Sequence, residues 1–336
     1  MMTIGDVINE YGQQHTPYMN QLVNHLPMGQ LALYRMTGDI ETVKKYSMDF
    51  CRRFHFDQVK PPEGTVSSLE ACLGKREMYA DCLMLIRQMV EKEGLESVVK
   101  EVLNTYIHGM SSGLFHVLIR MAYAMEGVAL EKQLKEEAVR ALAYYITAYR
   151  EAKLLYRRIL PDQVVAEMKS LEQDNKIRQI LSDHDSMGRK IRGLYASEYY
   201  LDKGFVVHGD ESDKVKGLLM LLVPAFKNSN HILVLHGITG LHALLVLKPY
   251  CNDFSLALDI YTTSCLTHLL TTDNLIYHGT DPVRQEQAWA SLRRQGSQSK
   301  DVHTIKFTYT CSQLEEQFGY VTAGLKDAAA FRIDSN

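Results

Sequence analysis

The segment from His231 to Lys248 restricts the possible folds more than any other part of the chain. It reads His-Ile-Leu-Val-Leu-His-Gly-Ile-Thr-Gly-Leu-His-Ala-Leu-Leu-Val-Leu-Lys, so three histidines and two glycines stand in an otherwise almost wholly apolar run. A buried imidazole needs a hydrogen bond, a charged partner or a metal ion to offset the loss of its hydration. The segment therefore predicts a buried helix that carries a candidate functional site.

Helix geometry limits how these three histidines act together. An α-helix turns by about 100° and rises by about 1.5 Å per residue, so His231 and His242 share a face but lie roughly 16 Å apart. His236 and His242 are about 9 Å apart and about 120° out of phase, whereas metal-bound imidazole nitrogens lie roughly 2.1 Å from their ion. Only one of them is expected to bind a given ion, unless the helix breaks at Gly237 or Gly240. The alternative is that all three are core histidines bonded to carbonyl groups.

The composition excludes several classes of partner. The 336 residues carry a net charge of -3 without a basic or acidic tract, which argues against nucleic-acid binding. The six cysteines form no Cys-x-x-Cys pair and predict free thiols in a reducing compartment. No signal peptide is evident, and the longest apolar run, Gly217–Phe226, is interrupted by Pro224 and is too short to cross a bilayer. We therefore expect a cytoplasmic protein with no membrane partner.

The spacing of apolar residues is helical along most of the chain, and alternating strand patterns are sparse. Helices are predicted over Gln21–Gly38, Ile40–Phe54, Ser67–Gly94, Leu95–Ile107, Met110–Glu126, Glu131–Ile159, Val164–Gly193, Tyr195–Val223, His231–Lys248 and Ser255–Tyr277, with a last helix from Asp301. His25 lies in the first turn of the first helix, His116 lies near the start of the helix from Met110, and His268 lies in the helix from Ser255. The helix over Val164–Gly193 is expected to be a solvated face that can cover a pocket. No break between them is long enough to divide domains. We predict an all-α fold in which residues 1–336 form one large multi-helix domain with an internal pocket.

Several catalytic motifs are absent from the sequence. It contains no Gly-x-Gly-x-x-Gly fingerprint, P-loop, His-Glu-x-x-His or Gly-x-Ser-x-Gly motif. Ser111 and Ser112 have no base at a specific spacing, so they are not interpreted as nucleophiles. The chemistry therefore has to come from histidine and lysine inside apolar helices, and converging imidazoles suit iron, zinc or copper.

One such pair opens the last predicted helix. His303 and Lys306 are three residues apart, so they share a helix face with about 4.5 Å of rise between them. Both side chains can address one point. The apolar neighbours Ile305 and Phe307 are expected to lower the pKa of the lysine.

At four motifs the sequence resembles the questin oxidase-like family. They are Asn24-His25 followed by Leu-Ala-Leu-Tyr and Gly38, Gly113-Leu-Phe-His116, His236-Gly-Ile-Thr-Gly-Leu-His242, and Asp301-Val-His303-Thr-Ile-Lys306. Fungal relatives open anthraquinone rings of aromatic polyketides in a formally Baeyer–Villiger reaction. One branch resembles a non-heme iron dioxygenase in which four histidines and a carboxylated lysine hold the metal.

The resemblance implies a set of site residues in this chain. The metal ligands it implies are His25, His116, His236 and Lys306, the last as a carboxylated lysine, with either His303 or His242 as the fourth histidine. His242 and His303 are also the catalytic candidates. Fe(II) is the expected cofactor, with zinc or another divalent metal as the alternative ion. A lysine takes up CO2 only as the neutral amine, which agrees with its apolar neighbours.

Three functions follow from these expectations. The leading one is an oxidoreductase, an iron-dependent oxygenase that acts on an aromatic or polycyclic small molecule with O2. A second is a metal-free or NADPH-assisted oxygenase that uses His236 as a general base, although no nucleotide motif supports it. The third is a non-catalytic helical protein that binds a small molecule.

Overall fold

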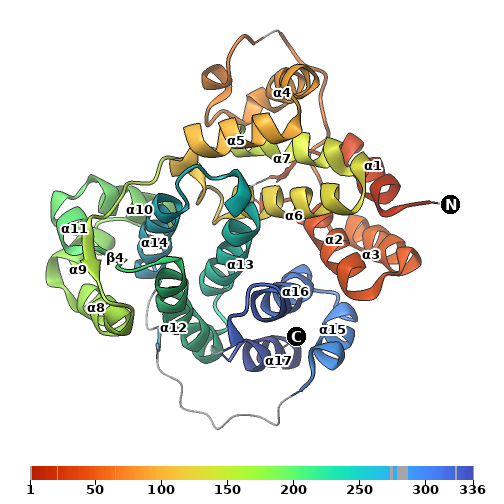
Figure 1. Cartoon of the computed structure of the whole chain (residues 1–336). Helices are drawn as coiled ribbons and strands as arrows, with labels where there is room; N and C mark the ends of the chain where they lie inside the picture. The colour runs from red at the N-terminus through yellow and green to blue at the C-terminus, as the bar shows by residue number, and fades with distance from the viewer. Residues whose placement is uncertain are drawn as a thin grey trace.

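The helix α13 (Ile232–Leu247) lies near the middle of a bundle of helices and packs against four of them. The computed structural model describes residues 2–20, 22–64, 66–272, 275–277, 287–321 and 324–335. Figure 1 shows α13 surrounded by α6 (His116–Leu130), α12 (Glu211–Ser229), α14 (Phe254–Leu270) and α16 (Val302–Glu316).

Helices make up nearly all the regular structure in the described part of the chain. The other α-helices are α1 (Ile4–Gln14), α2 (Leu26–Thr37), α3 (Ile40–Arg53), α4 (Tyr79–Glu93), α5 (Leu95–Thr105), α7 (Lys135–Thr147), α8 (Val164–Gln173), α9 (Asn175–Ser182), α10 (Met187–Ala196), α11 (Glu198–Lys203), α15 (Trp289–Ser297) and α17 (Leu325–Asp334). Short 3-10 turns are η1 (Leu69–Cys72), η2 (Arg76–Met78), η3 (Ile107–Gly109), η4 (Lys132–Leu134), η5 (Pro161–Gln163) and η6 (Lys248–Tyr250). The all-α prediction is confirmed.

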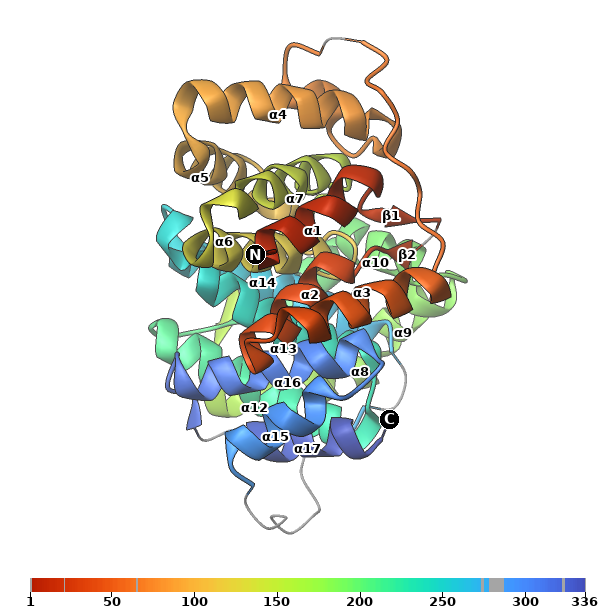
Figure 2. The ribbon, with the colours of Figure 1, turned by 90° about the vertical axis from the view of Figure 1, so that its right-hand side faces the viewer.

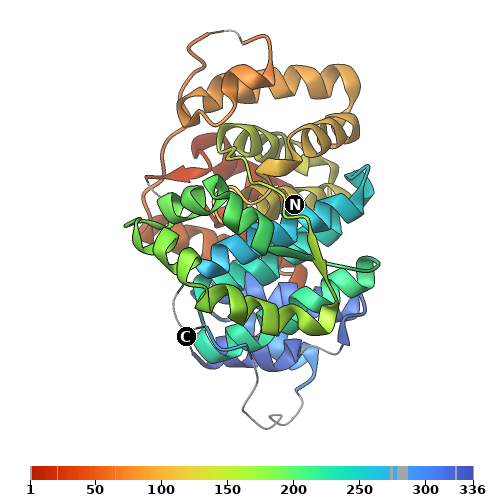
Figure 3. The ribbon, with the colours of Figure 1, turned by 90° about the vertical axis from the view of Figure 1, so that its left-hand side faces the viewer.

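Two small sheets complete the fold within the described residues. The strand β1 (Tyr18–Met19) pairs antiparallel with β2 (Leu22–Val23), and β3 (Arg157–Ile159) pairs parallel with β4 (Phe205–Val207). Figure 2 shows α4 and α5 at one end of the molecule and α15 and α17 at the other. In Figure 3, the green segment that contains α8 to α11 covers the side facing the viewer.

The central helix stays unbroken at both of its glycines. A Cβ atom at Gly240 would lie 2.9 Å from the Tyr261 hydroxyl oxygen, closer than real Cβ contacts are found, and 3.0 Å from Phe115 Cβ, which is tighter than most such contacts. The Tyr261 hydroxyl also donates a hydrogen bond to the carbonyl oxygen of Gly237. These glycines therefore let α14 and the turn before α6 approach the α13 backbone, and they do not interrupt the helix.

The segment Ile232–Tyr250, formed by α13 and η6, is long and apolar enough to cross a membrane by length and composition. The apolar run considered from the sequence, Gly217–Phe226, lies in α12 and is shorter. Within the structure, 78% of the α13–η6 window is buried against other parts of the chain. That burial is typical of the central helix of a helical bundle.

Two helix boundaries near the site differ from the sequence-based prediction. The helix predicted from Gln21 starts at Leu26, because the preceding residues form the β1–β2 hairpin; Gln21 itself lies outside the described residues. The helix predicted from Met110 starts at His116, because turns occupy the residues before it. Both corrections place a histidine at the point where a helix begins.

Other differences lie elsewhere along the chain. The helix predicted over 67–94 starts at Tyr79, because η1 and η2 occupy part of the residues before it. The segment 164–193 is divided among α8, α9 and α10, and the helix predicted over 195–223 is interrupted by β4.

The helix predicted over 131–159 ends at Thr147, because Arg157–Ile159 pair with β4 as a strand instead. The helix predicted up to Tyr277 ends at Leu270, and residues 273, 274 and 278–286 lie outside the described ranges. The helix predicted to be last, α16, is followed by α17. All six cysteines are free, as predicted.

A buried carboxyl group lies between α6 and α16. The Tyr309 hydroxyl donates a hydrogen bond to Glu126 Oε1 at 2.6 Å, and Glu126 Oε2 is buried without a hydrogen-bond partner among the described residues. Burial raises the pKa of Glu126 to about 7, against the opposing effects of the Tyr309 bond and Arg35. The folded protein therefore favours the protonated form of this side chain.

We predict that Glu126→Gln stabilises the protein in a pH-dependent way. Because the folded pKa lies above the unfolded value of about 4.3, the contribution of Glu126 to stability is complete below that value and is lost as pH rises through 7. Gln keeps an acceptor for Tyr309 and does not ionise. The variant should exceed the wild type in unfolding free energy by about 3 kcal/mol at pH 8 and by much less at pH 5.

Urea unfolding at the two pH values measures this difference. Glu136→Gln, which alters an exposed carboxylate paired with Arg87, is the control and should show a small change at both pH values. An equal stabilisation by Glu126→Gln at pH 5 and pH 8 would contradict the assignment.

Candidate metal centre

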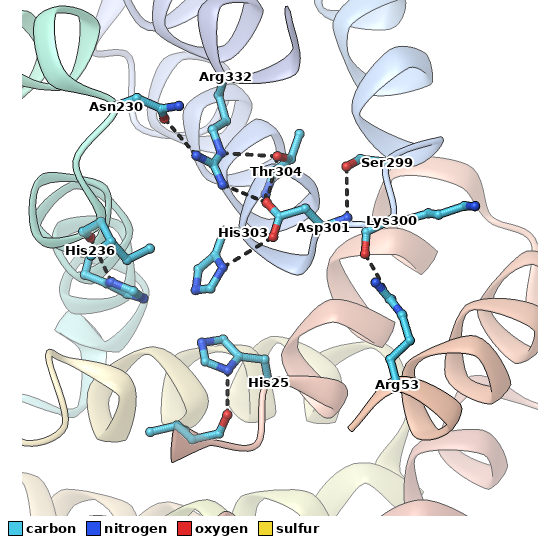
Figure 4. Close-up of polar contacts among 12 residues, drawn as sticks. His25, Arg53, Asn230, His236, Ser299, Lys300, Asp301, His303, Thr304 and Arg332 are labelled. Atoms are coloured by element: carbon cyan, nitrogen blue, oxygen red, sulfur yellow. Dashed lines mark hydrogen bonds and ion pairs between the residues drawn. The ribbon is translucent and has the colours of Figure 1, made fainter. Parts of the chain in front are cut away.

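Four histidines from separate segments meet beside α13. His25 precedes α2, His116 opens α6, His236 lies in α13 and His303 lies in the first turn of α16. One ring nitrogen from each lies within 4.8 Å of all the others. Figure 4 shows His25, His236 and His303 turned toward one space between their helices. A set of this kind can hold a metal ion.

The orientation of each ring is fixed by a hydrogen bond or ion pair at its Nδ1 atom. The four contacts are His25 Nδ1 to the Val23 carbonyl oxygen at 2.6 Å, His116 Nδ1 to the Gly113 carbonyl oxygen, His236 Nδ1 to the Ile232 carbonyl oxygen at 2.9 Å, and His303 Nδ1 to Asp301 Oδ1 at 3.5 Å. Carbonyl and carboxylate oxygens only accept hydrogen bonds, so each Nδ1 carries the hydrogen. The Nε2 lone pairs are left free, as in protein sites where histidine binds a metal.

Two of these lone pairs face each other directly. The Nε2 atoms of His25 and His116 are 2.6 Å apart, and with both Nδ1 atoms protonated neither Nε2 has a hydrogen to share. His236 Nε2 is buried and has no hydrogen-bond partner among the described residues. A shared cation would satisfy all three atoms and remove the repulsion between the first two.

The environment keeps the imidazoles neutral. Burial is the largest cause of a lowered pKa at each of the four histidines, and the pKa values of His25, His116 and His236 lie well below the ordinary value. The positive charge of Lys306 lowers all four further. Neutral imidazole is the form that binds metal ions.

Lys306 lies one turn beyond His303 on α16 and is completely buried. Its Nζ atom has no hydrogen-bond partner among the residues that the structure describes. Burial lowers the pKa of Lys306 to about 7, with Asp301 acting in the opposite direction. A large fraction of this amine is therefore neutral at physiological pH, and its spacing from His303 puts both on one face of α16.

The backbone before α6 is unusual where it delivers His116. Gly113, Leu114 and Phe115 have φ values of 59°, 57° and 65°, so three consecutive residues adopt the left-handed conformation. This conformation is strained for Leu and Phe, and such strain is concentrated at functional sites. The turn brings the Gly113 carbonyl oxygen to the Nδ1 atom of His116.

Asp301 anchors the histidine on α16. It is the N-cap of that helix and accepts hydrogen bonds from the Thr304 backbone N–H at 2.7 Å and from Arg332 Nη2 at 2.8 Å. Figure 4 shows Arg332 at one oxygen of Asp301 and His303 at the other, while Arg332 also donates to Asn230. Although burial opposes ionisation, the bonds from His303, Arg332 and Thr304 hold the pKa of Asp301 well below its usual range.

His242 does not join the cluster, so the fourth place belongs to His303. On the unbroken α13 helix the His242 side chain points elsewhere, and its ring contacts Tyr309 and Phe318 with centroid distances of 5.9 Å. It does not line the cavity beside the four histidines. The expectation that His242 is a catalytic residue or the fourth ligand therefore lacks support in the structure. His231 is the N-cap of α13 and accepts a hydrogen bond from the Leu233 N–H.

A cavity of about 740 Å³ opens beside the four histidines. Its walls are mainly apolar, with side chains such as Leu114, Ile191 and Ile232. Part of the wall comes from α10, so the charged segment after Val164 covers a pocket, as the sequence suggested. Ser112 also lines the cavity, but its hydroxyl oxygen accepts a bond from the Arg150 N–H at 2.7 Å, so its role here is structural.

His268 lines the same cavity and was not among the residues selected from the sequence. It is the only histidine on α14, and the run around it from Ala257 to Leu270 is buried throughout. A polar exception on an apolar helix was the signal that selected the other histidines. Applied to α14, the same signal finds His268 but also Asp259, so the sequence alone does not single out the histidine.

We predict that Asp301→Asn weakens metal binding without removing the cap of α16. Asn is as good an N-cap as Asp, but it loses the negative charge that orients His303. Loss of such an outer partner typically lowers metal affinity by about 10- to 100-fold. Asp253→Asn is the matched control, because Asp253 caps α14 in the same way, with a bond from Leu256 N–H at 2.8 Å. Isothermal titration with Fe(II) or Zn(II) measures both, and equal affinities would contradict the role given to Asp301.

The comparisons with known proteins agree with this arrangement. A family model described as questin oxidase-like matches residues 22–311, which include all four histidines and Lys306. A comparison with curated proteins finds no significant match. The family description implies an oxidoreductase of the oxygenase kind. Because the model covers well over half of the sequence, this chain belongs to the questin oxidase-like family.

Proposed function

We propose that this protein is an Fe(II)-dependent oxygenase that oxidises an aromatic or polycyclic small molecule with O2. The observation that carries the proposal is the orientation of the four histidines. Each Nδ1 atom contacts a protein oxygen, and the four rings present nitrogens within 4.8 Å of one another. Membership of a family of oxidoreductases supports the same reaction class.

The residues present suit a redox-active metal. His25, His116, His236 and His303 would hold the ion, and Lys306 would add an oxygen ligand as a carbamate. Imidazole suits iron, zinc and copper, but zinc has no redox chemistry, so iron fits the reaction class of the family better. When bound, iron supplies the one-electron chemistry with O2 that organic molecules alone lack.

Carboxylation of Lys306 follows from its environment. The neutral amine attacks the carbon of CO2, a C–N bond forms, and one proton is released to give a carbamate anion. Only the unprotonated amine reacts, and the lowered pKa of Lys306 makes that form available near pH 7. The carbamate would give the unpaired nitrogen of Lys306 polar neighbours, and its negative charge would offset the positive charge of the bound cation.

The remaining chain shapes the space where the substrate binds. The mainly apolar cavity beside the histidines has room for a ring system of several fused rings, and its walls exclude water from the bound molecule's faces. The turn from Gly113 to Phe115 and the helix α10 both contribute to these walls. The strained turn therefore positions His116 and borders the substrate at the same time.

Two other functions are less well supported. A metal-free oxygenase with His236 as general base requires an imidazole that takes up a proton near neutral pH, but burial holds the pKa of His236 well below its ordinary value. A non-catalytic binding protein has no need for four imidazoles that share one centre. The metal content of the purified protein distinguishes both alternatives from the proposal, because only the proposal requires bound iron.

We predict that His236→Ala abolishes stoichiometric iron binding and leaves the helix content unchanged, because only a ligand is lost. His242→Ala is the matched control: it removes a buried histidine from the same helix but from outside the cluster. Metal analysis of both variants, with circular dichroism as the folding check, tests the pair. Normal iron content in His236→Ala, or an equal loss in His242→Ala, would refute the site.

We also predict that bicarbonate strengthens metal binding through Lys306. Wild-type protein should bind Fe(II) more tightly when bicarbonate is present than after CO2 is removed, whereas Lys306→Ala should show no such dependence. Added acetate should partly restore binding in Lys306→Ala, because it supplies a carboxylate oxygen in the space left by the side chain. Carbon-13 NMR of wild-type protein with labelled bicarbonate should show one carbamate signal that the variant lacks. The spectrum is recorded with diamagnetic Zn(II) in the site, because Fe(II) would broaden the signal, and the absence of the signal in zinc-bound wild type would contradict the carbamate.

A further inference from the structure

The cavity beside the four histidines contains a fifth histidine that none of the preceding roles uses. His268 lies near the end of α14, a helix that supplies none of the cluster, and 6% of its surface is exposed. Its ring packs edge-on against Phe115, with centroids 5.1 Å apart and an interplanar angle of 71°. Phe115 directly precedes His116, so the ring is held next to the turn that borders the cluster.

No hydrogen bond joins the His268 ring to another described residue, in contrast to the four cluster histidines, whose Nδ1 atoms all contact protein oxygens. It faces the cavity instead. A neutral imidazole has one N–H donor and one lone-pair acceptor. The side chain is largely buried but borders the cavity, so the hydrogen-bond partner of its ring comes from whatever occupies the cavity, either water or a bound molecule.

The surroundings of His268 define the kind of group it can bind. The charged residues that line the same cavity are Arg150, Glu151 and Arg192, all of them exposed. Burial lowers the pKa of His268 to about 4, so the ring is neutral near pH 7 and acts as a hydrogen-bonding group and not as a charge. The rest of the nearby wall is apolar, as at Ile191 and Ile232.

We propose that His268 is a substrate-positioning residue, which hydrogen-bonds to a hydroxyl or carbonyl oxygen on an otherwise apolar ring system in the cavity. This inference rests on the proposed function for the reaction that follows binding. Among ring compounds of the same shape, His268 therefore favours one with an oxygen substituent at the matching edge over its parent hydrocarbon, which leaves the imidazole unpaired. The bond also fixes which edge of the ring system faces His268, and so which part faces the cluster.

The probes that test this are 2-naphthol and naphthalene, which differ by one hydroxyl group. Fluorescence titration gives the affinity of each for the protein as purified and for the same protein after dialysis against a chelator. Wild-type protein should prefer 2-naphthol in both preparations. His268→Phe should bind 2-naphthol about three- to tenfold more weakly, the range for one lost hydrogen bond, and naphthalene with unchanged affinity.

Two further variants complete the experiment. His268→Gln keeps a donor and an acceptor and should restore part of the preference for 2-naphthol. His208→Phe removes an exposed histidine outside the cavity and should behave as wild type. Thermal unfolding of each variant confirms that it folds.

Unchanged 2-naphthol affinity in His268→Phe, an equal loss for both probes, or failure of wild-type protein to bind 2-naphthol would each overturn the proposal. Iron content is measured in parallel and reports on the proposed function separately. A preference for 2-naphthol that depends on His268 in protein without iron would support this proposal while the metal site fails. Stoichiometric iron together with unchanged 2-naphthol affinity in His268→Phe would support the metal site and overturn the role of His268.

Discussion

The site depends on hydrogen bonds and an ion pair that turn four imidazoles inward. Every Nδ1 atom of the cluster contacts a carbonyl or carboxylate oxygen, so every Nε2 lone pair is available. Without these contacts, the four rings would each be free to change tautomer and orientation. The local backbone supplies three of the acceptors, from residues two to four positions before the histidine, and Asp301 supplies the fourth. The orientation of the donor set is therefore built into the ends and turns of the helices.

The fold brings these helix ends and turns together around one central helix. Two of the four histidines stand where helices begin, one follows the cap of α16, and His236 reaches the same point from the second turn of α13. Glycines in α13 allow its neighbours to pack closely against its backbone. Lys306 then adds a buried amine on the α16 side, and the cavity gives the site an approach from α10. In the proposed function, metal binding, carboxylation and substrate access would thus involve different sides of one cluster.

Much of this could be predicted from the sequence, because apolar spacing identifies helices and polar exceptions identify candidate site residues. Helix geometry alone restricted α13 to one ligand for a given ion, and it separated His242 from His236. The choice of His303 over His242 required the packing of α16 against α13, which no local pattern contains. The starts of α2 and α6 were placed too early because the hairpin before His25 and the left-handed turn before His116 are set by tertiary contacts. His268 was passed over because its significance depends on the cavity that it faces.

The central claim is that one iron ion binds to His25, His116, His236 and His303 together. Anomalous X-ray diffraction at the iron edge, from crystals of protein purified with Fe(II), tests it most directly. The account predicts one anomalous peak roughly 2.1 to 2.2 Å from the four Nε2 atoms, with a carbamate oxygen of Lys306 as a further neighbour. A peak at another place, or one that fewer than three of these nitrogens approach, would contradict it.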